Sequence, residues 1–224
     1  MRIAVLTETF PGEARVAATP DSVRALIKAG ASVSVEKGAG LSASVTDAAY
    51  QAAGANCVTR AAAIKDGEVF LTVRRPDAAT LAKLPKGAVL IGLLDPHGDK
   101  DFAKACADAG VNALAMEYTP RITRAQSMDA LSSQSNLAGY RAVIEAATLY
   151  GRAFPMMMTA AGTVAAAKAF IMGAGVAGLQ AIATARRLGA IVSANDVRPA
   201  AKEQVGSLGA KFIAVEDEEF KAAE

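Results

Sequence analysis

The chain has 224 residues, of which 52% are hydrophobic and 21% charged, and its formal net charge is +2 at pH 7. That length is enough for one large domain or two small ones. Because charges of both signs are interspersed, we expect no electrostatic attraction to nucleic acid or to lipid head groups. Cys57 and Cys106 lie far apart and have no companion histidines, so we expect two reduced thiols and no metal site.

Strand and helix signals alternate through the first 115 residues. Thr19 is a helix-capping residue, Pro20 suits the first helical position, and Gly30 ends the helix. A repeated strand–helix order at this spacing predicts an α/β fold with a mostly parallel sheet. Strands are expected at 2–6, 33–36, 69–73, 88–93 and 111–115, and further helices at 46–53, 78–84 and 99–109.

The segment 117–132 differs from what precedes it, because it is polar, has no clear period and carries hydrogen-bonding groups of every kind. After it, a long helix is expected from Asn136 to about Arg152. Such a helix suits a bridge between two lobes. We therefore predict a first lobe over 1–132, a linking helix over 133–155 and a second lobe over 156–224.

The most informative segment of the second lobe is a glycine-rich turn between an apolar strand and an apolar helix, Gly173-Ala174-Gly175-Val176-Ala177-Gly178. This order is what a dinucleotide-binding βαβ unit requires. Gly173 permits the tight turn, Gly175 lets the backbone approach a pyrophosphate, and Gly178 lets the helix pack close to the sheet. The first amides of the helix and the positive end of its dipole then face the phosphate oxygens.

An acidic residue, Asp196, follows the next strand, 23 residues after Gly173. A carboxylate at that position accepts both ribose hydroxyls and repels a 2′-phosphate, which favours NAD(H) over NADP(H). Arg198 argues the other way, since an arginine there can pair with that phosphate. The residues predicted to bind the cofactor are Gly173, Gly175, Val176, Ala177, Gly178, Asp196, Val197 and Arg198.

Two other interpretations of 164–185 are a buried helix hairpin with incidental glycines and a membrane-spanning helix. The 22 residues are long enough to span, since a bilayer needs about 20. However, Lys168 lies inside the segment, and each of its three glycines weakens a helix by about 1 kcal/mol. A helix is expected at 200–207 and a strand at 211–215. A dinucleotide-binding domain consists of two mononucleotide-binding halves, and these elements complete only about one of them. We therefore expect the second lobe to be incomplete before Glu224.

The segment Pro120–Tyr140 closely resembles the NAD(H)-binding soluble component of proton-translocating nicotinamide nucleotide transhydrogenase, and the resemblance continues through Arg152–Thr163 and Lys202–Val205. It implies two Rossmann-like α/β lobes with the nucleotide in the cleft between them, and a homodimer. It also implies an NADP(H)-binding component and a membrane-spanning proton-channel component as partners. The chain itself is then expected not to span the membrane and to lie at the cytoplasmic face of the inner membrane.

The same resemblance assigns the nicotinamide end of NAD(H) to a polar loop, matched here by Arg121, Gln126, Asp129 and Ser132. Arg121 and Asp129 can form an ion pair, Ser132 can hydrogen-bond the carboxamide, and Gln126 can bridge two nicotinamides without charging the site. The implied reaction is direct hydride transfer between NADH on this chain and NADP⁺ on a partner, coupled to proton translocation by the membrane component. A solvated loop with incidental polar residues is the simpler alternative.

Two further functions remain open from the sequence. The segment Gly12–Pro20 resembles a motif found in both the transhydrogenases and the alanine dehydrogenases. In the dehydrogenases, this resemblance implies that an arginine at the position of Arg15 would hold the pyruvate carboxylate. Those enzymes also need a lysine and a histidine for proton transfer, whereas this chain has Arg74-Arg75 and a single histidine, His97, in a sequence typical of a turn. A non-catalytic NAD-binding subunit is the other alternative.

Overall fold

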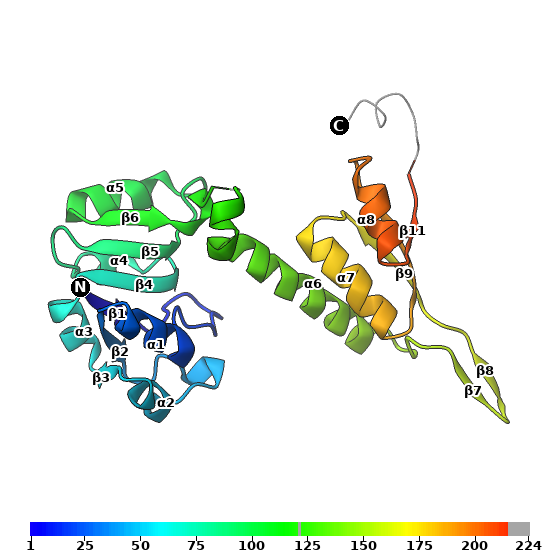
Figure 1. The fold of residues 1–224 in the computed structure, drawn as a ribbon, viewed down its shortest axis with the longest axis horizontal. Coiled ribbons are helices and arrows are strands. Elements are labelled where there is room, and N and C mark those ends of the chain that lie inside the picture. The colour runs from blue at the N-terminus through cyan, green and yellow to red at the C-terminus, as the bar shows by residue number, and fades with distance from the viewer. Residues whose placement is uncertain (121, 215–224) are drawn as a thin grey trace. The chain divides into compact units, whose positions relative to one another are not determined.

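The computed structural model describes residues 1–120 and 122–214, which separate into two compact units, Met1–Met128 and Asp129–Glu224 (Figure 1). The first unit contains a six-stranded, all-parallel sheet in the order β3-β2-β1-β4-β5-β6. The strand order reverses between β1 and β4, which is where ligands of doubly wound sheets bind. The strands are β1 Arg2–Val5, β2 Ser32–Glu36, β3 Asn56–Val58, β4 Val69–Arg74, β5 Val89–Leu93 and β6 Asn112–Ala115.

Helices connect these strands and bury both faces of the sheet. Successive residues at β1 alternate between two apolar clusters, with Ile3 and Val5 in one and Ala4 and Leu6 in the other. A strand buried on both faces is typical of a parallel α/β sheet. The connecting helices are α1 Pro20–Lys28, α2 Asp47–Ala52, α3 Arg60–Asp66, α4 Ala78–Leu81 and α5 Lys100–Ala109, with 3-10 turns η1 Leu41–Ala43, η2 Met116–Tyr118 and η3 Thr123–Met128.

Short polar side chains begin most of these helices. Thr19 accepts a hydrogen bond from the Ser22 amide, and α1 starts at Pro20 as its sequence predicted. The strand β3 and helix α3 were not predicted, because a three-residue strand shows no usable alternation. The caps of α2, α3, α4 and α5 are Thr46, Thr59, Asp77 and Asp99.

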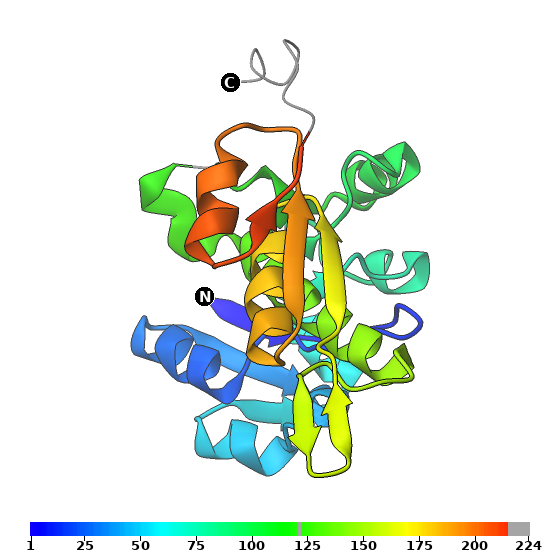
Figure 2. The ribbon, with the colours of Figure 1, turned by 90° about the vertical axis from the view of Figure 1, so that its right-hand side faces the viewer.

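The second unit has a three-stranded parallel sheet in the order β11-β10-β9 and a separate antiparallel hairpin of β7 and β8. Figure 2 shows the hairpin projecting beyond the sheet and its helices. Both units together confirm the predicted α/β class with two parallel sheets. The elements are α6 Ala130–Leu149, β7 Met157–Thr159, β8 Gly162–Val164, β9 Lys168–Met172, α7 Val176–Arg187, β10 Ile191–Asn195, α8 Ala201–Ser207 and β11 Lys211–Phe212.

The long helix is present, but its predicted ends were wrong. It starts at Ala130 instead of Asn136, because Asp129 caps it and overrides the low helix propensity of the serines that follow. It ends at Leu149, so the last residues of the linking helix predicted over 133–155 are not helical. Ser132 consequently lies in the first turn of α6 and not in a loop.

The two alternatives for 164–185 are both wrong, since this segment forms a strand, a turn and a helix. No helix within the described residues is long and apolar enough to cross a membrane.

Candidate functional site

Two glycines of the turn between β9 and α7 are required by the backbone geometry, and the third, Gly175, faces open space. Gly173 has φ +89°, which other residues rarely adopt. A Cβ on Gly175 would meet nothing within 4 Å, so the absent side chain leaves open space beside the backbone. A Cβ on Gly178 would lie 1.8 Å from the Gly173 carbonyl oxygen, so only glycine lets α7 approach the strand this closely.

The start of α7 offers backbone amides to an anion. Gly175 precedes the helix, and no side chain caps this end among the residues that the structure describes. The amides of Val176 and Ala177 therefore lie at the positive end of the helix dipole beside the space that Gly175 leaves. This arrangement fits the pyrophosphate of a dinucleotide.

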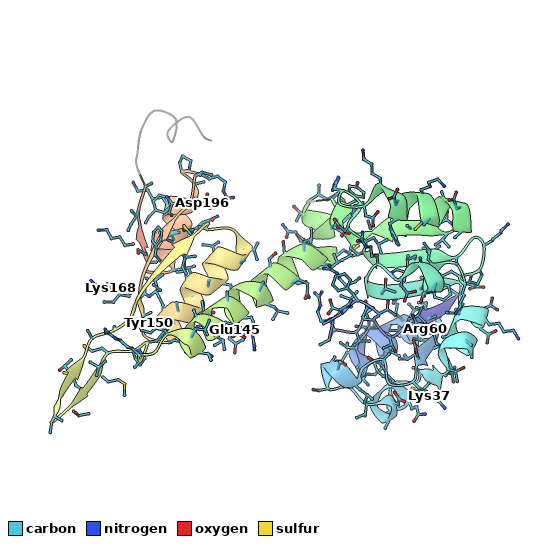
Figure 3. All side chains as sticks on the ribbon, turned by 180° about the vertical axis from the view of Figure 1, so that it is seen from behind. Lys37, Arg60, Glu145, Tyr150, Lys168 and Asp196 are labelled. Carbon is cyan, nitrogen blue, oxygen red and sulfur yellow. The ribbon has the colours of Figure 1, made fainter. Side chains whose placement is uncertain are left out.

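Asp196, which is labelled in Figure 3, lies immediately after β10. It is hydrogen-bonded to the glycine turn. Its Oδ2 accepts a hydrogen bond from the Ala174 amide at 2.7 Å, and its Oδ1 accepts one from the Arg198 amide at 2.9 Å. The Arg198 side chain adds bonds from Nε to Oδ1 at 3.0 Å and from Nη2 to Oδ2 at 3.1 Å. These bonds, from the Arg198 side chain above all, hold the pKa of Asp196 well below its usual value even though the residue is buried.

The structure brings together two of the four residues predicted for the nicotinamide end. Asp129 Oδ1 accepts the Ser132 amide at 2.9 Å, and the Ser132 hydroxyl donates to Asp129 Oδ2 at 2.6 Å. Both side chains are thereby fixed at the start of α6. Gln126 is exposed on η3 in the first unit, and Arg121 lies outside the described residues.

Helix α6 is held against α7 by a close backbone approach that sequence reasoning did not find. A Cβ on Gly139 would lie 2.0 Å from the Ala177 carbonyl oxygen. Asn136 also donates a hydrogen bond to Gln180 Oε1 at 3.3 Å. Gly139 itself was the signal that the sequence offered. A glycine inside a helix costs about 1 kcal/mol relative to alanine, so its presence usually indicates a close packing contact. The contact fixes α6, with Asp129 at its start, against the first turn of the dinucleotide helix.

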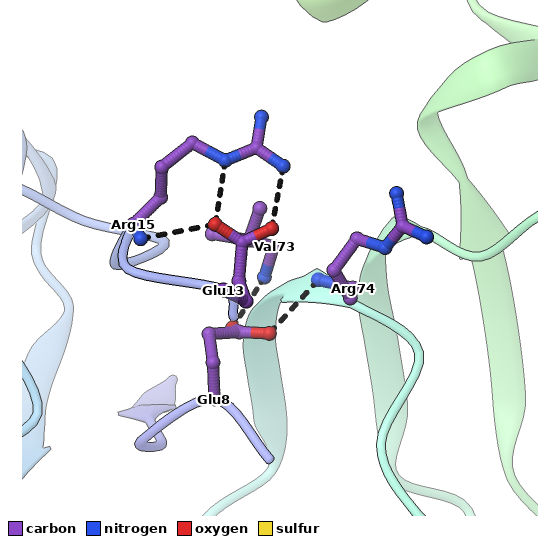
Figure 4. Close-up of polar contacts among 5 residues, drawn as sticks. All are labelled: Glu8, Glu13, Arg15, Val73 and Arg74. Atoms are coloured by element: carbon purple, nitrogen blue, oxygen red, sulfur yellow. Dashed lines mark hydrogen bonds and ion pairs between the residues drawn. The ribbon is translucent and has the colours of Figure 1, made fainter. Parts of the chain in front are cut away.

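In the first unit, carboxylate side chains accept hydrogen bonds from backbone amides at the carboxyl ends of the strands. Glu8 accepts the Val73 amide at 2.6 Å and the Arg74 amide at 3.0 Å (Figure 4). Burial raises the pKa of Glu8, and these two hydrogen bonds only partly offset that effect. Glu36 likewise accepts the Thr7 amide after β1, at 2.9 Å.

Glu117 repeats this arrangement after β5, where it accepts the Leu94 amide at 3.2 Å and the Asp95 amide at 2.7 Å. Five strand-end amides of this sheet thus have internal anionic partners. In the second unit, the Ala174 amide has an internal carboxylate partner in Asp196, and the helix start that follows it at Val176 has none among the described residues.

Arg15 and Arg74, the residues that bear on the dehydrogenase alternative, are engaged within the first unit. Arg15 donates to Glu13 from Nε at 2.7 Å and from Nη2 at 2.6 Å, and these bonds hold the pKa of Glu13 below its usual value. The Arg74 guanidinium lies over the Phe10 ring, 4.6 Å from its centroid. Arg15 would have to leave Glu13 before it could make the same bidentate contact with a carboxylate substrate.

His97 lies in an exposed turn, as its sequence predicted, with its ring edge-on to Tyr118 at 5.3 Å. Cys57 and Cys106 are free thiols, and burial raises the pKa of each. Among the residues described, no group of three acidic, cysteine or histidine side chains is placed to hold a metal ion.

Comparison with known proteins places both units in one family. The model of the alanine dehydrogenase/PNT N-terminal domain matches residues 4–138, and that of the C-terminal domain matches residues 142–224. An NAD(P) transhydrogenase subunit alpha protein of Rhodospirillum rubrum is 54% identical over 230 residues, which cover 100% of this chain and 60% of that protein. The crystal structure of transhydrogenase from Sinorhizobium meliloti matches with a TM-score of 0.93 at 59% identity, covering 96% of this chain and 64% of that chain.

An alanine dehydrogenase from Mycobacterium tuberculosis is more distant, at 32% identity over 203 residues, which cover 88% of this chain and 54% of that protein. The chain spans 60% of the length of the Rhodospirillum rubrum protein. The chain belongs to the alanine dehydrogenase/PNT family, and it is more similar to the transhydrogenase subunits than to the alanine dehydrogenase.

Proposed function

We propose that this chain is the NAD(H)-binding component of a proton-translocating transhydrogenase. The observation that carries the proposal is the glycine turn, where Gly178 allows the close helix approach and Gly175 leaves the first amides of α7 open to a pyrophosphate. Similarity at 54% identity to a transhydrogenase alpha subunit supports the reaction class.

The chain's own residues bind and orient the nucleotide. The amides of Val176 and Ala177 hold the pyrophosphate, and Asp196 receives the adenosine ribose hydroxyls, which favours NAD(H). The hydroxyl hydrogen of Ser132 is directed to Asp129, so the lone pairs of the Ser132 oxygen remain to accept from the carboxamide N–H of a nicotinamide. The bound nucleotide supplies the hydride that passes to NADP⁺. No proton is gained or lost at the ring carbon in such a step, so the protein's contribution is alignment.

Gln126 and Arg121 belong to the same proposal through the family resemblance. Gln126 is neutral and offers both donors and acceptors, so it can face two nicotinamides without favouring one redox state by charge. We assign NADP(H) to a partner component, proton translocation to a membrane-spanning component, and the chain itself to a homodimer at the cytoplasmic face of the inner membrane. The name "subunit alpha", which the relatives carry, supports the existence of partner subunits.

Alanine dehydrogenase activity is the second candidate, because a relative with that name is 32% identical. The bidentate Arg15–Glu13 pair and the arginines at 74 and 75 argue against it. A non-catalytic NAD-binding subunit is the third.

The test is hydride exchange between NADH and an NADP⁺ analogue, with and without an added NADP(H)-binding partner. Exchange that appears only with the partner supports the proposal, whereas NADH formation from alanine and NAD⁺ supports the dehydrogenase. NADH binding with neither activity supports the non-catalytic subunit.

Two substitutions test the loop residues directly. Gln126→Asn and Asp129→Asn are expected to slow hydride exchange at least tenfold while changing the NADH dissociation constant by less than about threefold. Gln51→Asn, at an exposed position of α2, is the matched control and should change neither. If the hydride-exchange rate and the NADH affinity fell by the same factor, the loop would contribute only to binding and not to alignment of the rings.

A further inference from the structure

The carboxylate of Asp196 is saturated by the protein itself. A carboxylate has about four in-plane lone-pair sites, two on each oxygen. Two are taken by the backbone amides of Ala174 and Arg198, and two by Nε and Nη2 of the Arg198 side chain. A ribose presents two hydroxyl donors to this acid, so the carboxylate cannot accept both while the guanidinium stays in place.

We propose that the Arg198 guanidinium is an internal competitor of the adenosine ribose, and that it must leave Asp196 when NAD(H) binds. This inference rests on the proposed NAD(H) site and assigns a regulating residue to it. The exchange is balanced in hydrogen bonds, since two guanidinium donors leave and two hydroxyl donors replace them. The two backbone donors remain, so Asp196 stays attached to the glycine turn at Ala174 throughout.

The surroundings permit this movement. The Arg198 side chain is 58% exposed, whereas that of Asp196 is only 7% exposed. The guanidinium can therefore turn into solvent, where it is rehydrated, while the acid remains fixed beside the turn. The neighbouring Val197 is 77% exposed, so no packed side chain at that position blocks the way.

A competitor and an ordinary cationic contact predict opposite effects of removing the side chain. If Arg198 only attracted the negative pyrophosphate, Arg198→Ala would weaken NADH binding. As a competitor, its removal frees two acceptor sites, and NADH should bind more tightly. A half-exposed ion pair contributes little, so we expect the dissociation constant to fall by about two- to fivefold. Arg198→Lys, which keeps the charge but loses the bidentate geometry, should lie between wild type and Arg198→Ala.

The experiment is calorimetric titration of the full-length protein with NADH. Arg187→Ala is the matched control, because it removes the same charge at the far end of α7 and should leave the affinity unchanged. In an Asp196→Asn background, Arg198→Ala should lose its tightening effect, because the competition requires the carboxylate.

The outcomes separate the two ideas. If wild type does not bind NADH, or if Asp196→Asn binds it as tightly as wild type, the proposed nucleotide site is wrong and the competitor with it. If wild type binds and Asp196→Asn binds more weakly, but Arg198→Ala fails to tighten binding, the site stands and the competitor is refuted.

Discussion

The approach of α6 to α7 makes a strong prediction for Gly139→Ala. The added Cβ would lie 2.0 Å from the Ala177 carbonyl oxygen, whereas ordinary contact begins at 3.4 Å, so the two backbones must separate by about 1.4 Å. The Ala177 oxygen is a backbone atom and a Cβ is fixed directly to its own Cα, so neither atom can rotate away as the end of a flexible side chain would.

Overpacking of this kind costs about 1–3 kcal/mol, and alanine in place of glycine inside a helix returns at most about 1 kcal/mol. With the full gain of about 1 kcal/mol subtracted, we expect Gly139→Ala to lower the free energy of unfolding by up to about 2 kcal/mol. Because Asp129 and Ser132 start the same helix, their displacement should also slow hydride exchange, and a misplacement of about 1 Å can cost about a hundredfold.

Urea denaturation measures the stability, and hydride exchange with the partner component measures the rate. Gly206→Ala is the matched control, since Gly206 lies in α8 with nothing within 4 Å of an added Cβ, and it should gain about 0.5–1 kcal/mol. If Gly139→Ala were stabilised as much as Gly206→Ala, the close approach of α6 and α7 would not exist.

The glycine turn, Asp196 and the buried Tyr50 hydroxyl each lead to a further expectation. Gly178→Ala should destabilise the protein, while Gly175→Ala should leave stability within about 0.5 kcal/mol of wild type yet weaken NADH binding at least tenfold; equal stability of the two variants in urea would contradict this. The pKa of Asp196 is lowered in the folded state, so its contribution to stability is complete above the unfolded value of about 3.9 and is lost as the pH falls further; acid titration should show a smaller loss for Asp196→Asn. Tyr50→Phe removes a buried hydroxyl that donates to the Ala18 carbonyl at 2.7 Å and should cost about 1–2 kcal/mol by denaturation, and an unchanged midpoint would refute that.

The sequence was sufficient wherever a local pattern decides the structure. The cap at Thr19, the alternating strands and the glycine turn all involve residues within a few positions of one another, and each lies where it was predicted. The acid at Asp196 was placed at a strand end because the length of a βαβ unit is nearly constant.

Long-range pairing could not be predicted in the same way. Glu8 binds amides 65 and 66 residues away, and no spacing rule connects those positions. The true start of α6 was missed because serines have low helix propensity, and the hydrogen bonds from Ser132 to Asp129 stabilise that first turn as helix. The saturation of Asp196 by Arg198 also needed side-chain geometry, since the sequence showed only that an arginine was close.

A crystal structure of the protein with NADH would show whether a dinucleotide lies against the turn between β9 and α7, as we propose. We expect the pyrophosphate on the amides of Val176 and Ala177, and the adenosine ribose on Asp196 with the Arg198 guanidinium displaced. The carboxamide should lie within hydrogen-bonding distance of Ser132. Nucleotide bound at the strand ends near Glu8, or none bound at the glycine turn, would contradict this proposal.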